Sequence, residues 1–554
     1  MTAGWPPAPP AGRASRAKRG SPWTDPPGGT AFVAVPSSAN RHARGMVAPM
    51  HSADRHILHL HRRGLLTGAL ALTALATQPG CVALAQEEGL FGLGVASGDP
   101  WPDSVVLWTR LTPRTPEPVP LRWEIAADDG FRQVVARGEA VAGPDHGHAV
   151  HVIPTGLQPG RHYWYRFTAQ GQTSRVGRTR TAPAPDADVP VRFVNASCQR
   201  YEHGYFTAWR HAAADDALDF VFFNGDYIYE YGHRAVGASP LIARAVDGPE
   251  CVTLDQYRAR YAQYRRDADL QAVHAAHPFI VTFDDHEVQN NWVSDIPSVP
   301  QPAGVEFALR KAAAFRAWYE NMPVRPAALP RGPDITAYRR LVFGRQMALH
   351  VLDTRSFRDD QPCGDGRKQA CEAVHNPAAQ VMGSAQEAWL FDSVRNGAAM
   401  QVLGQQIFMA TRPYPGDQFS MDSWDGYPAA RSRVMQGLRD RGIANPIVLT
   451  GDVHRAWAGL VTAGDRALGT EFVATSIASD GDGRDADAGA LALIAAHPHL
   501  RFHSARRGYT RHEAARGRMT AEYLALPYVS RPGAEAAPVA KLMTEARAPG
   551  IIPA

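Results

Sequence analysis

Side chains that can bind metal ions or transfer protons follow directly after five short apolar runs of the chain. In an open α/β sheet, ligands bind beyond the carboxyl ends of the strands. If the five runs are strands, their polar ends are therefore expected to meet in one crevice. The apolar runs are Val191–Val194, Phe220–Phe223, Phe279–Phe283, Met347–Leu352 and Ile447–Leu449. The residues that follow them include Cys198, Asp226, Tyr229, Asp285, His286, Asn291, Arg355, Asp452 and His454.

Three carboxylates in this set predict bound cations. Carboxylates that lie close together repel one another and raise one another's pKa unless cations hold them. Their oxygens are hard donors that suit calcium, magnesium or manganese, and they belong to Asp226, Asp285 and Asp452. An aspartate between two ions bridges them, giving a pair ~3.5–4 Å apart that can clamp an in-line phosphoryl displacement. The carboxylates therefore predict a site with more than one metal ion.

The remaining candidate ligands are nitrogen, sulfur and phenol groups. His454 adds a nitrogen donor, Cys198 could add a thiolate and Tyr229 a phenolate. A phenolate forms at neutral pH only if its pKa falls well below ~10, and a trivalent ion is the obvious agent of such a shift. Taken singly, each residue has an ordinary explanation, because a lone Gly-Asp is usually a turn and a cysteine after a strand is usually a buried thiol. Their joint occurrence favours the multi-metal site.

The region from Phe91 to about Thr181 is expected to be all β. From Phe91 to about Thr181, short β runs alternate with Pro and Gly, and no helical stripe occurs. Leu157–Tyr163 is typical of the turn and tyrosine corner of an immunoglobulin or fibronectin sandwich. We therefore interpret residues 89–182 as a small β-sandwich domain. Its β runs are Ser104–Thr109, Leu121–Ile125, Ala149–Val152 and Tyr163–Phe167.

The pattern changes at Val191. From there, apolar runs that end in polar clusters alternate with helix-like stretches, which indicates an α/β domain over residues 189–525. Ile407–Met409 is a weaker strand candidate, and the Ala/Pro-rich residues 526–554 are expected to form an extended or loosely docked tail. Helical periodicity is expected in Tyr205–Ala213, Leu254–Ala262, Phe307–Glu320 and Ala385–Ser393.

Residues 1–85 are interpreted as a disordered leader followed by an export signal. The first 50 residues show no periodic pattern that could pack a core. Arg62-Arg63 precede an uncharged stretch that runs to Ala76, and Ala83–Ala85 offers a small-residue cleavage site. Paired arginines before a weakly apolar segment resemble a twin-arginine signal, with an ordinary secretory signal as the alternative. The signal predicts export through the twin-arginine machinery to the periplasm or the medium. The apolar run is too short to span a membrane, so no membrane anchor is expected.

Composition and charge exclude several classes of protein. A chain of 554 residues with 45% hydrophobic residues can bury two or three domain cores, which excludes global disorder and a disulfide-dense miniprotein. The net charge is +4, but residues 1–85 hold nine Lys/Arg and two Asp/Glu, which leaves −3 for the remainder. No basic footprint for nucleic acid therefore survives. Cys363 and Cys371 bracket a short loop and could form a local disulfide in an oxidising compartment.

Several motifs together resemble the calcineurin-like metallophosphoesterases, and most closely the PhoD-type alkaline phosphatases. The motifs are Gly225–Glu230, Asp284–Val288, Leu352–Arg355 and Thr450–His454, strengthened by Ser197–Gln199 and Phe91–Pro100. The resemblance spans residues 90–525. It implies an α/β-sandwich catalytic domain preceded by a small β-sandwich, and hydrolysis of phosphate monoesters or diesters by a metal-activated water or hydroxide. It also implies Fe(III) together with one or two calcium ions, with zinc and manganese as alternatives.

The resemblance further implies a role for each candidate residue. Asp226 is the bridging carboxylate, and the iron ligands are Cys198, Tyr229 and His454. The calcium ligands are Asp285 and Asp452, with Asn291 and Glu287 as candidates for a second calcium.

His286 is expected to face the phosphate rather than a metal, and either to stabilise the transition state or to protonate the leaving alkoxide. Arg355 is expected either to contact phosphate or to form a buried pair with Asp353.

Two other functions are alternatives to a phosphate monoesterase. A phosphodiesterase or a phospholipase D-type enzyme would use the same metal core, so the motifs do not separate it from a monoesterase. A non-catalytic cell-surface protein would instead use the β-sandwich as its binding module. A nucleotide-dependent enzyme is disfavoured because no Gly-rich phosphate loop follows a strand.

Overall fold

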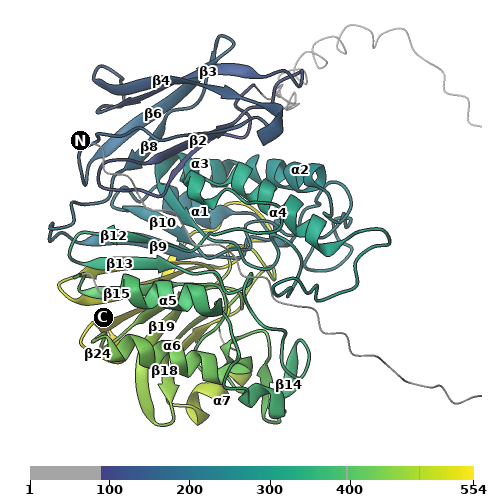
Figure 1. Ribbon diagram of the computed structural model, residues 1–554, viewed down its shortest axis with the longest axis vertical. Helices are drawn as coiled ribbons and strands as arrows, with labels where there is room; N and C mark the ends of the chain where they lie inside the picture. The colour runs from purple at the N-terminus through teal and green to yellow at the C-terminus, as the bar shows by residue number, and fades with distance from the viewer. Residues whose placement is uncertain (1–88, 395–396, 486) are drawn as a thin grey trace, which may run out of the picture. The chain divides into compact units, whose positions relative to one another are not determined.

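The computed structural model describes residues 89–394, 397–485 and 487–554. The leader and export signal expected in residues 1–85 lie outside the described residues. Among the helices that the structure describes, none combines the length and apolar character needed to cross a membrane. Two large β-sheets with helices on their outer faces form most of the described chain, and a smaller sheet lies beside them (Figure 1).

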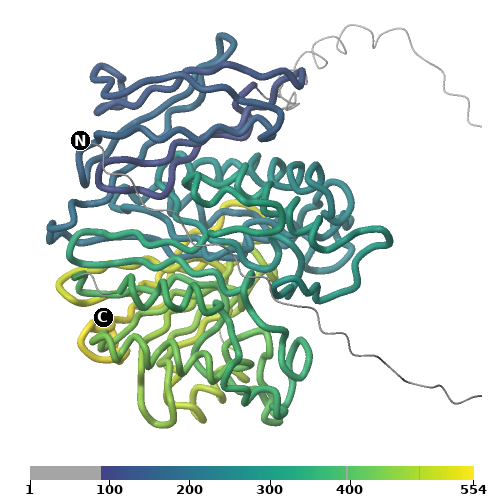
Figure 2. The backbone as a smooth tube through the Cα atoms, viewed as in Figure 1, coloured from purple at the N-terminus to yellow at the C-terminus, as the bar shows by residue number. Residues whose placement is uncertain are grey.

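The larger sheet has ten strands in the order β24-β23-β22-β21-β9-β10-β11-β1-β2-β5. Its three central strands, β9, β10 and β11, run parallel, and the C-terminal chain, yellow in Figure 2, returns to pair β21 antiparallel with β9. The bounds are β9 Val191–Ala196, β10 Phe220–Phe223, β11 Pro278–Val281, β1 Val95–Gly98, β2 Val106–Arg110, β5 Ala149–Val152, β21 Arg507–Ala515, β22 Arg518–Leu526, β23 Ala537–Glu545 and β24 Ala548–Pro553.

The second large sheet has seven strands in the order β12-β13-β15-β17-β19-β18-β20. Strands β13, β15, β17 and β19 are parallel to their neighbours in this run. The bounds are β12 Arg339–Phe343, β13 Met347–Val351, β15 Met400–Gly404, β17 Ile447–Thr450, β18 Ala456–Ala463, β19 Arg466–Val473 and β20 Leu500–Ser504.

The two large sheets bury a common apolar core. Phe193, Phe220 and Phe222 of the ten-stranded sheet share one cluster with Leu349 and Val402 of the seven-stranded sheet. Helices cover the outer face of each sheet: α1–α4 pack on β10 and β11, and α5 and α6 pack on β15 and β17 (Figure 1). The bounds are α1 Thr207–Ala213, α2 Leu254–Arg265, α3 Ala268–Ala276, α4 Phe307–Asn321, α5 Gly383–Ser393, α6 Pro428–Asp440 and α7 Ala488–Ala496. The predicted α/β sandwich is therefore confirmed.

The predicted β-sandwich is also present, but it shares a sheet with the α/β domain. One face is a five-stranded sheet, and the other is β1, β2 and β5, which continue the ten-stranded sheet through the pairing of β1 with β11. The five strands are β3 Val119–Ala126, β4 Val134–Ala142, β6 His162–Ala169, β7 Gln172–Thr173 and β8 Gly177–Arg180. The tyrosine corner forms as expected, because the Gln158 backbone N–H donates to the Tyr163 hydroxyl at 2.8 Å.

The Phe91–Pro100 motif contributes to this junction through an ion pair between the buried Asp99 and the partly buried Arg339. Asp99 lies directly after β1 with a φ of 43°, and its Oδ1 accepts hydrogen bonds from Arg339 at 2.9 and 2.7 Å. The backbone N–H of Arg325 donates to the other carboxylate oxygen at 3.2 Å. The motif therefore fastens the sandwich to the α/β domain.

One strand prediction and the prediction of a C-terminal tail were wrong. Residues Ile407–Met409 are not a strand; the neighbouring strand is β15, which ends at Gly404 and was missed because its run contains Gln401. The tail expected over residues 526–554 instead forms β23 and β24, which extend the ten-stranded sheet by antiparallel pairing to β22. Most residues of β23 and β24 are exposed or only partly buried, so their sequence lacks the regular apolar alternation that would predict a strand.

The local disulfide is present between Cys363 and Cys371, eight positions apart. It closes a loop that carries β14 (Arg367–Gln369), and β14 pairs antiparallel with β16 (Gln418–Ser420).

Candidate metal centre and catalytic site

Five of the predicted site residues have left-handed backbone conformations. Positive φ is uncommon for residues other than glycine because it costs roughly 1–3 kcal/mol. Such conformations persist only where the surrounding structure enforces them, and they cluster at functional sites. Cys198, Asp226, Asp452 and His454 lie two to four residues after the ends of β9, β10 and β17, and Asn291 lies in the longer loop after β11. The φ values are 58° for Cys198, 59° for Asp226, 51° for Asn291, 64° for Asp452 and 56° for His454.

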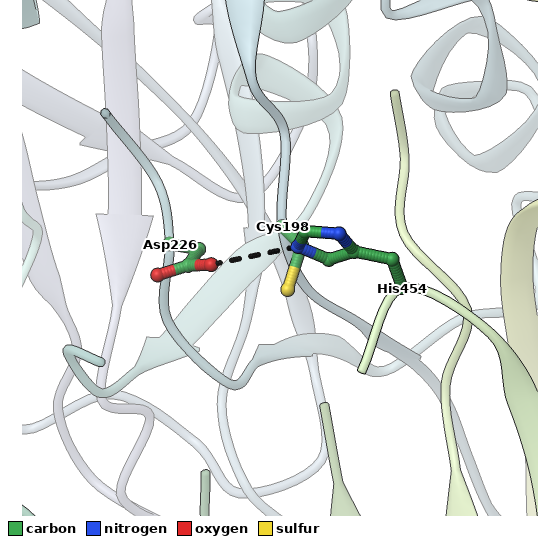
Figure 3. Close-up of side chains that lie close together, drawn as sticks. All are labelled: Cys198, Asp226 and His454. Atoms are coloured by element: carbon green, nitrogen blue, oxygen red, sulfur yellow. Dashed lines mark ion pairs between the residues drawn. The ribbon is translucent and has the colours of Figure 1, made fainter. Parts of the chain in front are cut away.

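Cys198, Asp226 and His454 meet at one point, although they come from three different strand ends (Figure 3). Each offers a ligand atom, and these atoms lie within 4.8 Å of one another. The Tyr229 hydroxyl joins them, because it donates to Asp226 Oδ2 at 2.7 Å and lies 3.0 Å from His454 Nε2. We call Cys198, Tyr229 and His454 the mixed-donor end of the site.

Two more groups of possible metal ligands adjoin the first. Asp226 groups with Asp285 and His286, and Asp285 groups with Asp284 and Asp452. Asp226 and Asp285 are each shared by two groups, so the three groups form one continuous row. We call Asp284, Asp285 and Asp452 the carboxylate end, and Asp226 lies between the two ends.

The donor chemistry fits metal ions at both ends. Burial, followed by the charge of Asp226, raises the pKa of the Cys198 thiol and the Tyr229 phenol well above their usual values. These groups become anionic ligands only with a cation beside them. Burial also raises the pKa of Asp452 to about 7, with Arg355 opposing and Asp422, Asp285 and Asp226 reinforcing the shift.

Arg355 supplies positive charge to the carboxylate end. Its side chain is fully buried, and its Nε donates to Asp284 at 2.6 Å. Its terminal nitrogens lie 2.8 Å from Asp422 and 3.3 Å from both Asp285 and Asp452. Burial alone would raise the pKa of Asp285, but Arg355 lowers it below its usual value.

The expected side-chain pair between Arg355 and Asp353 is replaced by this carboxylate network. Asp353 Oδ1 instead accepts the backbone N–H groups of Arg355 and Ser356, both at 2.9 Å. Asp353 therefore shapes the turn after β13, and the guanidinium points to the metal-ligand candidates.

His286 lies against the middle of the row. Its Nδ1 is 2.8 Å from Glu230 Oε2, and its ring lies 4.1 Å from the Tyr229 ring. Burial would lower the pKa of His286, but the charges of Asp285, Glu230 and Asp226 raise it to about 10. These three carboxylates therefore favour the protonated form of the ring.

Glu287 and Asn291 hold the loops around the site. Both carboxylate oxygens of Glu287 accept backbone N–H groups, from Asp226 at 3.0 Å, Tyr227 at 2.6 Å and Asp284 at 2.8 Å. This contact fixes the turn that carries Asp226. The Asn291 backbone N–H donates to Asp285 Oδ2 at 2.7 Å, which places Asn291 beside the carboxylate end.

Besides Asp284, which stands in a quoted motif without an assigned role, and Ser479, sequence reasoning missed four acidic residues of this region: Glu230, Asp365, Asp422 and Asp480. Glu230 stood inside a quoted motif and was not assigned a role. Asp365 and Asp422 lie in the loops around β14 and β16, and Asp480 follows β19 without a recognisable motif. A search for acidic residues close to the quoted motifs would have found Glu230, whereas the other three depend on long-range folding.

Two family models match the chain. The PhoD-like phosphatase model matches residues 193–523, and the model of the PhoD-like phosphatase N-terminal domain matches residues 75–183. Alkaline phosphatase D from Bacillus subtilis (strain 168) is 45% identical over 461 residues, which is 80% of this chain and 79% of that protein.

A solved structure described as the structure of PhoD matches with a TM-score of 0.81 and 43% identity, covering 84% of this chain and 92% of that one. These matches support a phosphoric ester hydrolase, and they do not support the alternative of a non-catalytic binding protein. Metal dependence accords with the clusters of ligand groups. On the breadth of the family match and the extent of the identity, the chain belongs to the PhoD-like phosphatase family.

Proposed function

We propose that the row of ligand groups is the catalytic centre of an exported phosphatase that hydrolyses phosphate esters by in-line displacement at phosphorus. The observation that carries this proposal is the sharing of Asp226 and Asp285 between adjacent groups of ligand atoms. Shared carboxylates are what neighbouring metal ions require, and two ions clamp both the attacking and the leaving oxygen.

The two ends of the row suit different ions. We assign Fe(III) to Cys198, Tyr229 and His454, because thiolate and phenolate donors suit a strongly charged ion, with zinc and manganese as alternatives. We assign calcium to Asp285 and Asp452, with Asn291 as a further oxygen ligand, because calcium takes only oxygen donors. Asp226 would bridge the two ends.

When bound, such ions act as Lewis acids toward phosphoryl oxygens and lower the pKa of water from 15.7 to ≈ 7. His286 then serves as the proton donor, because Glu230 holds its Nδ1 and leaves Nε2 directed toward the row of ligands. In this scheme His286 protonates the leaving alkoxide or stabilises charge on the phosphoryl group.

Arg355 is better suited to a positioning role than to the phosphate contact expected from the sequence. Its guanidinium is fully buried and contacts four carboxylates, so it orients Asp284, Asp285 and Asp452 and limits their repulsion. We propose that it holds the carboxylate end together.

The test is phosphate release from a simple aryl phosphate monoester and from the matching diester, with elemental analysis of the same purified enzyme. The proposal expects hydrolysis of at least one ester, stoichiometric metal, and loss of both in Asp452→Asn. Asp465→Asn, in the exposed turn between β18 and β19, is the matched control. A metal-free enzyme with full activity would refute the proposed chemistry, and the ratio of the two rates decides between a monoesterase and a phosphodiesterase or phospholipase D-type enzyme.

Export is a separate proposal, supported by Arg62-Arg63 and the small-residue site at Ala83–Ala85. Replacing both arginines with lysine should retain the enzyme in the cytoplasm of an expressing bacterium. Unchanged release from the cytoplasm would refute the twin-arginine route.

A further inference from the structure

Two neighbouring residues, Ser479 and Asp480, contact two different members of the mixed-donor end. They lie after β19, in a segment that no sequence motif marked. Ser479 is fully buried, and Asp480 has a φ of 69°. The left-handed turn allows both side chains to reach the ligand groups from the same short segment.

Ser479 directs a hydrogen bond at Tyr229. The backbone N–H of Arg200 donates to Ser479 Oγ at 3.0 Å, and Ser479 Oγ donates to the Tyr229 hydroxyl oxygen at 2.8 Å. A serine hydroxyl has one hydrogen and two lone pairs. Because Arg200 occupies an acceptor position, the single hydrogen of Ser479 is free to point at the phenol oxygen.

Asp480 fixes the orientation of His454. Its Oδ2 lies 3.1 Å from His454 Nδ1, while His454 Nε2 faces Tyr229 at 3.0 Å and Asp226 at 4.0 Å. A carboxylate on Nδ1 keeps the proton there and leaves the Nε2 lone pair available to a cation.

Hydrogen bonds to other parts of the chain hold the rest of this segment in place, so the contacts of Ser479 and Asp480 belong to a well-anchored loop. The Asp480 backbone N–H donates to His203 Nδ1 at 2.9 Å, and Arg507 Nε donates to the Gly481 carbonyl at 2.9 Å. Asp482 Oδ1 accepts backbone N–H groups from Val529 at 2.6 Å and from Ser530 at 2.8 Å.

We infer that Ser479 and Asp480 are a pair of positioning residues that orient Tyr229 and His454 toward one cation and adjust their donor strength in opposite directions. The hydrogen bond from Ser479 withdraws electron density from a phenolate, which weakens it as a ligand. The carboxylate of Asp480 increases the basicity of the imidazole, which strengthens it. This inference rests on the proposed metal site at the mixed-donor end.

The test compares wild-type holoenzyme with Ser479→Ala and Asp480→Asn. Metal content is measured by elemental analysis, the rate of metal loss is measured in excess chelator, and the charge-transfer band is measured by visible absorption. Asp480→Asn should bind the metal about 10- to 100-fold more weakly. Ser479→Ala should retain its metal, with a band shifted to longer wavelength, because a phenolate without the hydrogen bond gives up an electron more easily.

Conservative variants and a neighbouring control separate positioning from general damage. Ser479→Thr keeps the hydroxyl and should restore the band, and Asp480→Glu should recover part of the metal affinity. Asp485→Asn removes an ion pair with Arg506 in the same segment and should change neither readout.

The outcomes distinguish this inference from the proposed function. A wild-type enzyme without metal would overturn both. A metal-loaded wild type whose affinity and band are unchanged in Asp480→Asn and Ser479→Ala would overturn the positioning roles alone. A metal-loaded wild type without such a band would overturn the role of Ser479.

Discussion

The two ends of the row of ligand groups balance their charge in different ways. At the carboxylate end, the buried guanidinium of Arg355 already supplies positive charge and lowers the pKa of Asp285. At the mixed-donor end, the thiol of Cys198 and the phenol of Tyr229 have pKa values raised by burial and by Asp226. The carboxylate end thus has a cation built into the protein, whereas the mixed-donor end depends on a bound ion to hold its ligands as anions.

This difference teaches which end tolerates metal loss. Asp285, paired with Arg355, has a lowered pKa and can stay ionised after its ion leaves. Burial raises the pKa of Asp452 to about 7 and that of Asp284 well above its usual value, so these two carboxylates can take up protons. A thiol and a phenol without an ion take up protons, so restoring the mixed-donor end requires proton release as well as ion binding. We therefore expect the two ends to differ in how readily they are emptied and refilled.

The largest effect is expected from removing the residue that the two ends share. Asp226→Asn keeps the size of the side chain but removes the charge, so neither end retains its bridging ligand. Turnover should fall on the order of 10³-fold or more, and both ions should be bound more weakly. Steady-state rates with elemental analysis provide the measurement. Near-normal turnover with both metals bound would contradict a bridging role for Asp226 between the two ends.

The next largest effect is expected from Arg355→Met, which removes the built-in positive charge that distinguishes the carboxylate end from the mixed-donor end. Removing one partner of a buried ionic network leaves uncompensated charges and costs about 3–5 kcal/mol of stability. Added calcium should recover part of this loss, because it replaces the missing positive charge. Denaturant unfolding with and without calcium measures the effect. A stability loss that calcium does not change would argue against calcium at the carboxylate end.

The pH dependence of ion binding should sharpen the comparison with a smaller effect. The pKa of Asp452 is raised to about 7, so below pH 7 an ion at the carboxylate end must displace a proton. His454 has a pKa raised to about 9, because its contacts with Asp226 and Asp480 outweigh the opposing effect of burial. Affinity at the carboxylate end should therefore rise up to about pH 7 and then level off. Affinity at the mixed-donor end should keep rising over the whole range, because the Cys198 thiol and the Tyr229 phenol, whose pKa values lie well above their usual values, also give up protons on binding.

Metal titrations of the depleted enzyme from pH 5.5 to 9.5 measure both curves. The expected slope below each pKa is about tenfold in affinity per pH unit for one displaced proton, since a tenfold change in an equilibrium constant is about 1.4 kcal/mol. Identical curves for the two ends would contradict the distinction.

The sequence supports the site better than it supports the fold around it. The central strands are short and apolar, and polar residues follow them within a few positions. The local sequence pattern was therefore enough to identify Cys198, Asp226, Asp285, Asp452 and His454. The meeting of Cys198, Asp226 and Asp285 required only that β9, β10 and β11 be parallel and adjacent, whereas Asp452 and His454 follow β17 of the other sheet. In the structure the strand ends come from two facing sheets, which the resemblance implied and the apolar runs alone could not show.

The features that sequence reasoning missed depend on contacts between distant parts of the chain. Arg355 reaches Asp422 across 67 positions, and Asp480 reaches His454 from a segment without periodicity or motif. Strands β23 and β24 are recognisable only through their pairing partner β22, because Ala and Pro give them little apolar alternation. Local sequence patterns identify the candidate ligands, whereas the residues that contact and orient those ligands can be identified only from the tertiary structure.

The smallest effect is expected from opening the Cys363–Cys371 disulfide, and it should fall on one end alone. The disulfide closes the loop that carries Asp365, whose carboxylate accepts the Asn291 side-chain amide at 2.9 and 3.0 Å. Replacing both cysteines with serine loosens this loop, and Asn291 lies beside Asp285, so calcium affinity should drop by about two- to fivefold, a change below 1 kcal/mol. The mixed-donor end should be unaffected, and Cys251→Ser, which removes a buried thiol outside the disulfide, is the control. Calcium titration and the visible spectrum of the same samples measure the two ends separately. An equal loss at both ends would mean that the loop acts on the whole row, and that the ends are mechanically coupled through Asp226.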